Sequence, residues 1–117
     1  MLIGSAEALA ATSHVTAFKT QDVSCYFESV SPDLACAAAG IPRPKLKYQI
    51  GAANVSLKPT GRASVFDNGN GYSAVELKPG SKWERSGIEC TIGQPYVTCT
   101  NTDHHGFTIG GGRYKTF

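Results

Sequence analysis

The residue types best suited to chemistry stand together near the C-terminal end of the chain. Asp103, His104 and His105 are consecutive, and carboxylate and imidazole groups bind borderline metal ions and exchange protons near neutral pH. On an extended segment His104 and His105 would point to opposite faces, so a single site could use only one of them. We therefore predict a polar loop between two strands. A small metal-assisted hydrolase centred on Asp103, His104 and His105 is kept as the alternative.

Covalent catalysis lacks a recognisable nucleophile in this sequence. There is no Gly-x-Ser-x-Gly segment, the motif whose sharp turn exposes a catalytic serine. The nine acidic residues are scattered, without a spacing that selects a catalytic pair. The sequence therefore predicts no catalytic residue, no enzymatic activity and no cofactor.

A short basic segment is the first candidate for contact with a partner. Arg43, Lys45 and Lys47 alternate along the chain and would share one face of a strand, and Tyr48 follows them. Such a ridge could meet a partner protein, a lipid headgroup or an acidic polymer. Lysines and flanking prolines are equally typical of an exposed edge strand that avoids pairing. Three charges without interleaved aromatic side chains do not indicate nucleic-acid binding.

Trp83, the single tryptophan, is the second candidate for partner contact. An exposed indole ring would offer a platform on which a ligand could stack. The competing interpretation is a buried or half-buried anchor of the core, which is the commoner role of a lone tryptophan in a small domain.

The four cysteines form two close pairs along the chain, Cys25 with Cys36 and Cys90 with Cys99. No Cys-x-x-Cys segment is present, so zinc-knuckle and thioredoxin-type sites lack their spacing. Of the three possible pairings, we favour the two local ones, because each pair lies within one expected hairpin. Disulfides persist in oxidising compartments, so this pairing predicts a secreted or extracytoplasmic protein. Four buried free thiols in a cytosolic protein are the alternative.

A weak internal repeat supports this pairing. The phrase aliphatic, small or polar, cysteine occurs at Val23-Ser24-Cys25 and Leu34-Ala35-Cys36, and again at Ile88-Glu89-Cys90 and Val97-Thr98-Cys99. The period of two in a strand puts each aliphatic residue and its cysteine on one buried face. The residue between them is then expected on the opposite face.

The elements that must position these residues are short strands. The chain has 117 residues, 41% hydrophobic and 17% charged, with a net charge of +2, which fits one globular domain and excludes a two-domain enzyme or a disordered chain. Thirteen glycines and six prolines punctuate it at short intervals, and no long helical period occurs. Besides the cysteine hairpins, strands are expected at 44–50, 54–58, 63–66, 72–77, 107–109 and 114–117, with hairpins around the Asn-Gly-Asn-Gly turn and around Gly110-Gly111-Gly112.

These patterns predict an all-β fold. We expect a small antiparallel β-sandwich or barrel of about eight to ten short strands with two disulfide-stapled hairpins. Residues 14–117 would form this single domain. Residues 1–13 would be an N-terminal arm or the remnant of a signal peptide, because Ala8-Leu9-Ala10 fits the small-x-small pattern that signal peptidase reads. No stretch of about 18 apolar residues is present, so no membrane span is expected.

Two patches of the chain carry a family resemblance. The first is the phrase from Phe18 to Cys25, and the second comprises Gly87 to Cys90, Tyr96 to Thr102, His105 to Ile109, and Tyr114. They resemble the opening and closing segments of a family of small secreted actinobacterial, mycobacterial-type proteins of uncharacterised function. The resemblance implies export, two hairpin disulfides and a β fold, and it implies no reaction.

The sequence as a whole predicts a non-enzymatic, secreted or envelope-associated binding or accessory module. It would bind a partner protein, such as a membrane or envelope protein, as a subunit of a larger envelope complex. An inhibitor of an extracellular hydrolase is a variant of the same class, because disulfide-braced loops lose little entropy on docking. The metal-assisted hydrolase is the rival from another class.

Overall fold

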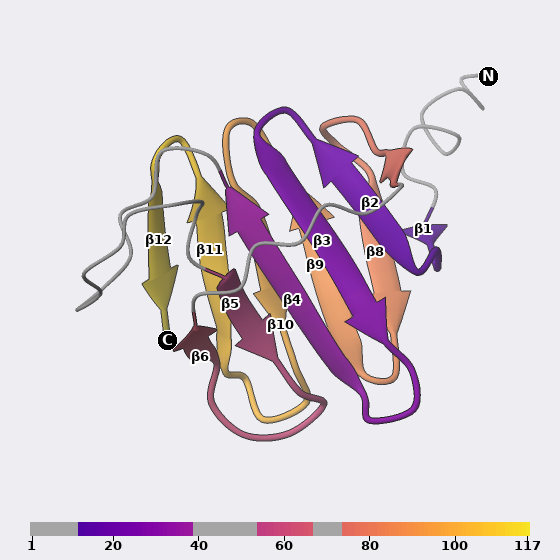
Figure 1. The fold of residues 1–117 in the computed structure, drawn as a ribbon, viewed down its shortest axis with the longest axis vertical. Coiled ribbons are helices and arrows are strands. Elements are labelled where there is room, and N and C mark those ends of the chain that lie inside the picture. Colours follow the sequence, from indigo (N-terminus) through magenta and orange to yellow (C-terminus); the bar gives the residue numbers. More distant parts are fainter. Residues whose placement is uncertain (1–11, 39–53, 67–73) are drawn as a thin grey trace, which may run out of the picture.

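The protein is a sandwich of two mixed β-sheets (Figure 1). The computed structural model describes residues 12–38, 54–66 and 74–117. Within them, sheet A has the strand order β1-β8-β9-β10-β11-β12 and sheet B has the order β6-β5-β4-β3-β2-β7. The strands of sheet A are β1 (Thr12–Ser13), β8 (Lys82–Arg85), β9 (Ile88–Ile92), β10 (Val97–Thr100), β11 (Gly106–Gly110) and β12 (Arg113–Thr116). Those of sheet B are β2 (Ala17–Thr20), β3 (Val23–Glu28), β4 (Asp33–Ala38), β5 (Asn54–Leu57), β6 (Ser64–Phe66) and β7 (Val75–Glu76).

The prediction of an all-β sandwich with two disulfide-stapled hairpins is confirmed. The described residues contain twelve strands, more than the eight to ten expected. Two of them, β1 and β7, have two residues each, too short for a period of two to be visible. They pair in parallel with β8 and β2, so the sheets are mixed at these edges and antiparallel elsewhere.

The prediction of a hairpin around the Asn-Gly-Asn-Gly turn is wrong. Its two arms supply β6 and β7, which lie at opposite edges of sheet B. β6 pairs with β5, and Val75 and Glu76 of β7 pair with Phe18 and Lys19 of β2. A turn-forming sequence does not determine which strands its two flanking segments pair with. Here the second segment, β7, pairs with the free edge of β2.

Each cysteine pair joins two directly opposed positions of a central hairpin. In β3–β4 Cys25 stands opposite Cys36, and in β9–β10 Cys90 stands opposite Cys99. Their Cα atoms are 4.1 and 4.0 Å apart, close to the separation of non-hydrogen-bonded antiparallel pairs. All four cysteines are therefore in disulfides, which indicates an oxidising environment.

The core lies between the sheets and follows the predicted alternation. The aliphatic residue and the cysteine of each repeated phrase are buried, while Ser24 and Glu89 are exposed on the outer faces. β11 packs across from β4 and β5 and closes the sandwich. The fully buried large side chains are Trp83, Phe18, Phe27, Phe107, Leu34, Leu57, Ile88, Ile92, Ile109, Val23, Val55 and Val97.

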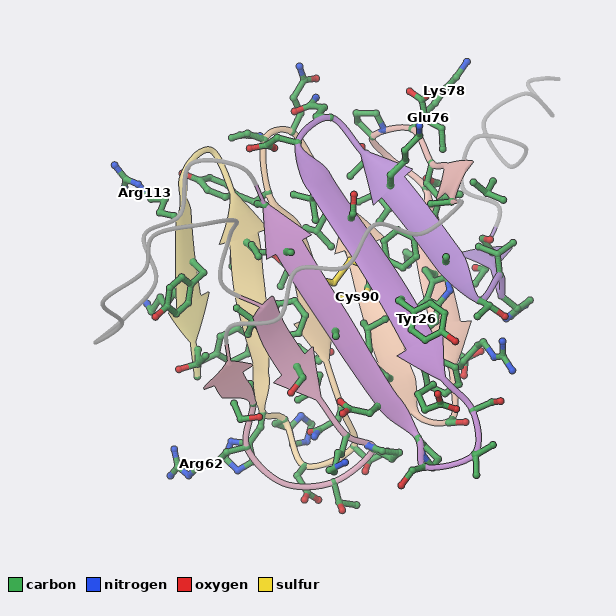
Figure 2. All side chains as sticks on the ribbon, in the orientation of Figure 1. Tyr26, Arg62, Glu76, Lys78, Cys90 and Arg113 are labelled. Atoms are coloured by element: carbon green, nitrogen blue, oxygen red, sulfur yellow. A yellow bond between two sulfur atoms is a disulfide. The ribbon has the colours of Figure 1, made fainter. Side chains whose placement is uncertain are left out.

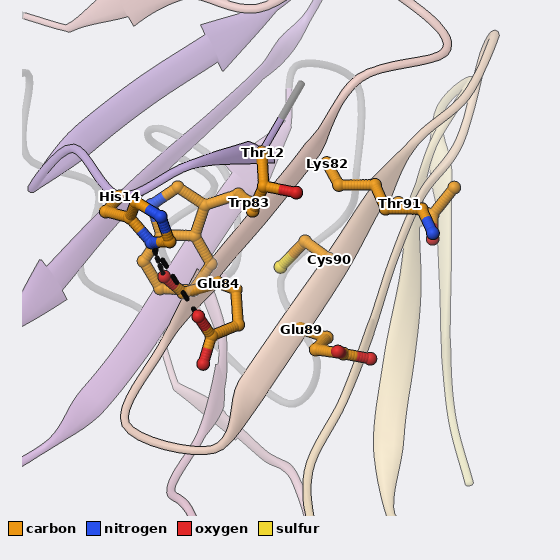
Figure 3. A pocket seen from close by; sticks show the side chains of 8 residues that line it. All are labelled: Thr12, His14, Lys82, Trp83, Glu84, Glu89, Cys90 and Thr91. Carbon is orange, nitrogen blue, oxygen red and sulfur yellow. Dashed lines mark hydrogen bonds and ion pairs between the residues drawn. The ribbon is translucent and has the colours of Figure 1, made fainter. Parts of the chain in front are cut away.

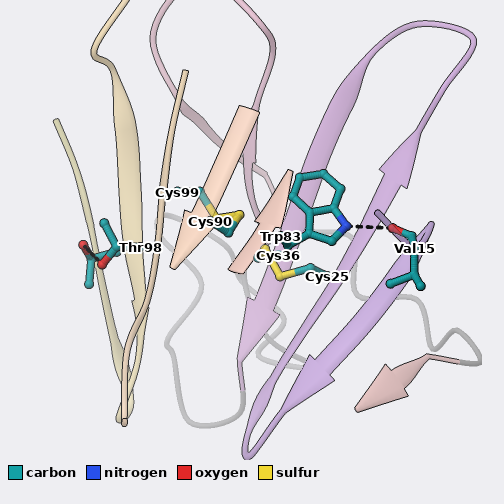
Figure 4. Close-up of a disulfide and its surroundings, with 8 residues drawn as sticks. Val15, Cys25, Cys36, Trp83, Cys90, Thr98 and Cys99 are labelled. Carbon is teal, nitrogen blue, oxygen red and sulfur yellow. Dashed lines mark hydrogen bonds between the residues drawn. A yellow bond between two sulfur atoms is a disulfide. The ribbon is translucent and has the colours of Figure 1, made fainter. Parts of the chain in front are cut away.

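Trp83 is the centre of this core and not a contact for a partner. Its side chain is 0% exposed, its ring lies 5.5 Å from Phe18 and 5.6 Å from Phe27, and both disulfides lie nearby (Figure 4). The indole Nε1 donates a hydrogen bond of 2.7 Å to the Val15 carbonyl. No ring face is left for a ligand, so the prediction of Trp83 as a partner-binding residue is wrong. Strand alternation turns it inward beside Cys90.

Several predictions fall outside the described residues. Arg43, Lys45, Lys47 and Tyr48 lie there, as does the strand expected at 44–50. Of the predicted N-terminal arm, Thr12 and Ser13 are described and form β1. Within the described ranges, no helix is long and apolar enough to cross a membrane.

The two bridges are expected to supply a measurable share of the stability. They close segments of 11 and 9 residues, and loop-closure entropy assigns each about 2.5 to 3 kcal/mol. The double variant Cys25→Ala/Cys36→Ala should therefore lower the free energy of unfolding in denaturant by about that amount. Ser24→Ala in the same hairpin is the control and should change it by less than about 0.5 kcal/mol. Equal unfolding midpoints for the oxidised and fully reduced wild type would contradict this assignment.

Candidate functional site

The outer face of sheet A carries an ordered set of polar side chains. The register aligns one residue from each strand in a single row, and these six residues are called the outer row. They are Thr12, Lys82, Thr91, Thr98, Thr108 and Lys115. Neighbouring strands lie about 4.8 Å apart, so the row repeats hydroxyl or ammonium groups at that spacing. The hydroxyls of Thr98 and Thr108 are 3.2 Å apart.

One end of this face is a groove of about 320 Å³ beside β1 (Figure 3). Its polar lining is Thr12, His14, Lys82, Glu84, Glu89 and Thr91, and the strand positions of Trp83 and Cys90, whose side chains are buried, also border it. His14 Nδ1 lies 2.7 Å from the Glu84 backbone oxygen and 3.7 Å from the Glu84 carboxylate. The carbonyl must accept from Nδ1–H, so Nε2 is the nitrogen left to accept a proton.

The other end of the face is a second groove, of about 220 Å³, near β12. We call it the tyrosine groove. It is lined by Tyr96, Thr108, Arg113, Tyr114 and Lys115. Arg113 and Lys115 alternate with Tyr114 along β12, which places both cations on the outer face, while Tyr114 packs against the core. Figure 2 shows Arg113 projecting from the β12 side of the molecule.

The glycine turn between β11 and β12 lies directly against Pro95. Gly111 and Gly112 both have positive φ, 60° and 79°, as a two-residue type I′ hairpin turn requires. Gly110 has φ 139°, and a Cβ there would lie 2.0 Å from the Pro95 carbonyl oxygen. Only glycine therefore fits at position 110. The predicted hairpin around these three glycines is confirmed.

The segment from 101 to 105 is a loop that joins β10 to β11 and ties the two sheets together. Asn101, 6% exposed, donates from Nδ2 to the backbone oxygens of Lys58 and Gly61, at 2.9 and 2.8 Å. Its Oδ1 accepts from the backbone N–H groups of Asp103 and His105, at 3.0 and 3.1 Å. The two amide N–H groups thus hold the β5–β6 connection against this loop, while the amide oxygen fixes the conformation of the loop itself.

The three candidate metal-binding residues do not form a common site. Asp103 Oδ2 accepts from the Gly61 backbone N–H at 2.8 Å, which gives this carboxylate a structural role. His104 lies in the left-handed region with φ 63°, as a tight loop demands. In the described part of the chain, no group of three or more His, Cys, Asp or Glu side chains is arranged to hold a metal ion.

Comparisons of this chain with protein-family models, with curated proteins and with solved structures find no match. The resemblance to small secreted actinobacterial proteins therefore stays a prediction.

Reasoning from the sequence did not find the tyrosine groove. A signal was present, since Arg113-Tyr114-Lys115 directly follows the three glycines and places two cations on one strand face. Tyr96 gave no such signal, because its place beside the turn depends on the pairing of β10 with β11.

We expect Asn101→Ala to destabilise the protein by about 3 kcal/mol, because it removes four part-buried hydrogen bonds to backbone groups. The adjacent Thr102→Ala removes one exposed hydrogen bond, from Oγ1 to the Pro59 oxygen at 2.9 Å, and should cost about 1 kcal/mol or less. Chemical denaturation of both variants tests this. Equal losses would show that Asn101 does not hold the two loops together.

Asp33 is expected to make stability depend on pH. Burial raises the pKa of Asp33 above its ordinary value of 3.8, against the opposing effect of Lys58, whose Nζ lies 3.7 Å from Oδ2. Oδ1 is buried without a hydrogen-bond partner among the described residues. The pKa of Asp33 is thus higher in the folded chain than in the unfolded chain, so the ionised carboxylate opposes folding at pH values above the folded pKa. This penalty disappears as the pH falls and the carboxyl is protonated.

Asp33→Asn should therefore gain stability relative to wild type as the pH is raised from about 3 to about 7. Thermal unfolding midpoints at several pH values give this difference. Lys58→Gln removes the cation that favours the carboxylate and should steepen the pH dependence of an otherwise wild-type chain. A difference between Asp33→Asn and wild type that does not change with pH would contradict the assignment.

Proposed function

We propose that this protein is a non-enzymatic, extracytoplasmic binding module whose contact surface is the outer face of sheet A. One observation carries the proposal. The described outer row and its two flanking grooves present hydroxyls and charges on a sheet whose central hairpin is closed by a disulfide. A surface fixed in this way loses little conformational entropy when a partner binds.

The bonding of the candidate reactive side chains supports a binding function without catalysis. All four cysteines are oxidised, and Asp103 is held by Gly61. His14 has a nitrogen free to accept a proton, but its side chain is 63% exposed, whereas catalytic bases work best in sites that exclude water. Among the described residues, the outer face of sheet A offers hydroxyl and charged groups, and none of them has the adjacent base that would activate a nucleophile.

Export fits the same chemistry. Two disulfides persist outside the reducing cytosol, and in a domain of this size they contribute much of the net stability. The function proposed is therefore that of a secreted or envelope-associated accessory module, with the outer face of sheet A as its docking surface for an envelope component.

A second candidate is inhibition of an extracellular hydrolase, and it rests on the tip of the β3–β4 hairpin. Val30 there is 90% exposed, and its N–H is held by Glu28 Oε1 at 3.2 Å. An aliphatic side chain on a disulfide-braced tip can enter an enzyme pocket at low entropic cost. Val30→Asp would abolish inhibition if this candidate is correct and leave it unchanged if sheet A makes the contact.

The internal repeat supplies a matched pair of variants for testing the main proposal. Thr98 and Ser24 each precede a bridged cysteine, one on the outer face of sheet A and one on that of sheet B. The oxidised protein, immobilised, is used to capture partners from the envelope fraction of its source. Thr98→Arg should weaken capture at least about tenfold, the loss of about 1.4 kcal/mol, while Ser24→Arg should not change it.

Denaturation midpoints close to that of wild type establish that both variants fold. Loss of capture with Ser24→Arg alone, or no change with either variant, would refute the assignment to sheet A. Turnover of ester, peptide or glycoside substrates that a chelator abolishes would instead favour the hydrolase.

A further inference from the structure

We propose that the tyrosine groove and the adjoining part of the outer row bind an acidic polysaccharide. This inference rests on the proposed function and names its ligand class. Tyr96 would pack against a sugar ring, Thr98 and Thr108 would exchange hydrogen bonds with sugar hydroxyls, and Arg113 and Lys115 would bind carboxylates.

The positive charge of the tyrosine groove favours an anionic ligand. Arg113 and Lys115 line it, and none of its described lining residues is acidic. Within the described part of the chain, neither cation forms an ion pair. A guanidinium can bind a carboxylate through two parallel hydrogen bonds. The groove therefore has unused capacity for carboxylates at its β12 side.

The aromatic lining suits a ring with a C–H face. Tyr96 is 38% exposed, and its ring lies beside Gly111, where a Cβ would be 3.7 Å from Cε1. The turn therefore packs against one edge of the ring, and the exposed part of the ring is available to a flat ligand. A tyrosine in such a position offers an apolar face together with a polar hydroxyl, as an amphipathic sugar ring requires.

The outer row gives the ligand a direction. Thr108 belongs to both the groove and the row, and the row continues through Thr98 and Thr91 to Lys82. Its hydroxyls recur at the strand spacing of about 4.8 Å, which is close to the length of one unit in a sugar chain. A linear polysaccharide anchored in the tyrosine groove could therefore lie across the strands toward Lys82. The groove at that end also holds Glu84 and Glu89, so the carboxylate contacts belong to the tyrosine groove.

Other acidic polymers use fewer of these features. An acidic peptide would be recognised mainly by main-chain bonds to a sheet edge, and it has no need of a row of hydroxyls on the face. Single-stranded nucleic acid needs several stacking rings along a cationic track. The combination of hydroxyl row, aromatic ring and paired cations favours the glycan.

The test measures binding of the purified, oxidised protein to polygalacturonate, with neutral dextran and poly-L-glutamate as comparison polymers. Wild type should bind polygalacturonate in preference to both, and more weakly at high salt. Arg113→Gln/Lys115→Gln should lose affinity at least about tenfold, Tyr96→Ala about fivefold, and Thr108→Val should weaken binding. Tyr96→Phe, which keeps the ring face, should retain it.

The control is a double variant of equal charge, Lys19→Gln/Arg62→Gln, with both positions in or beside sheet B. It should change affinity less than about twofold, because neither of the removed charges lines the groove. An equal loss in this control would show that net charge alone attracts the polymer and would overturn the proposal. Equal or stronger binding of poly-L-glutamate or dextran would overturn it as well.

The experiments distinguish a failure of the polysaccharide assignment from a failure of the proposed function. If polygalacturonate does not bind while Thr98→Arg still abolishes partner capture, the outer face is the binding surface and the glycan assignment is wrong. If polygalacturonate binds but neither groove nor row variants weaken it, the glycan assignment to the tyrosine groove is wrong, and the capture experiment with Thr98→Arg still decides the proposed function.

Discussion

Two covalent links between directly opposed strand positions are the constraint on which the rest of this structure depends. The bridges Cys25–Cys36 and Cys90–Cys99 fix the register of the central hairpin in each sheet. A shift of one residue would turn every side chain of a strand to the other face. The links that place the cysteines and Trp83 inside therefore also place Thr98 outside. The buried core and the outer face of sheet A follow from one register.

The sequence could predict the parts of the fold that local pattern determines. The repeated phrase around each cysteine combines a period of two with a short turn, and both hairpins form as expected. The pairing of Val75 with Phe18 joins positions far apart in the chain and involves only two ladder positions. Such a contact is chosen by competition between sheet edges, and no local pattern records it.

The same distinction explains what could be foreseen of the site. The cluster from Asp103 to His105 looked reactive because it contains the right residue types. In the structure Asp103 Oδ2 accepts from the Gly61 N–H, and the backbone N–H groups of Asp103 and His105 donate to Asn101 Oδ1, so these contacts serve the loop. The tyrosine groove is assembled from three strands, with Tyr96 beside β10 and Thr108 on β11. Its residues become neighbours only through sheet register, which the sequence specifies indirectly.

The two central hairpins share a plan but differ in what they present outward. The hairpin of sheet A directs four residues to its outer face, Glu89, Thr91, Thr98 and Thr100, whereas that of sheet B directs Ser24, Tyr26, Glu28, Asp33, Ala35 and Ala37. Threonine suits exposed strand positions by itself, so the hydroxyls of sheet A do not in themselves require a ligand. What distinguishes sheet A is that its hydroxyls stand in one row between two grooves, and the proposal of a binding surface there is based on this arrangement.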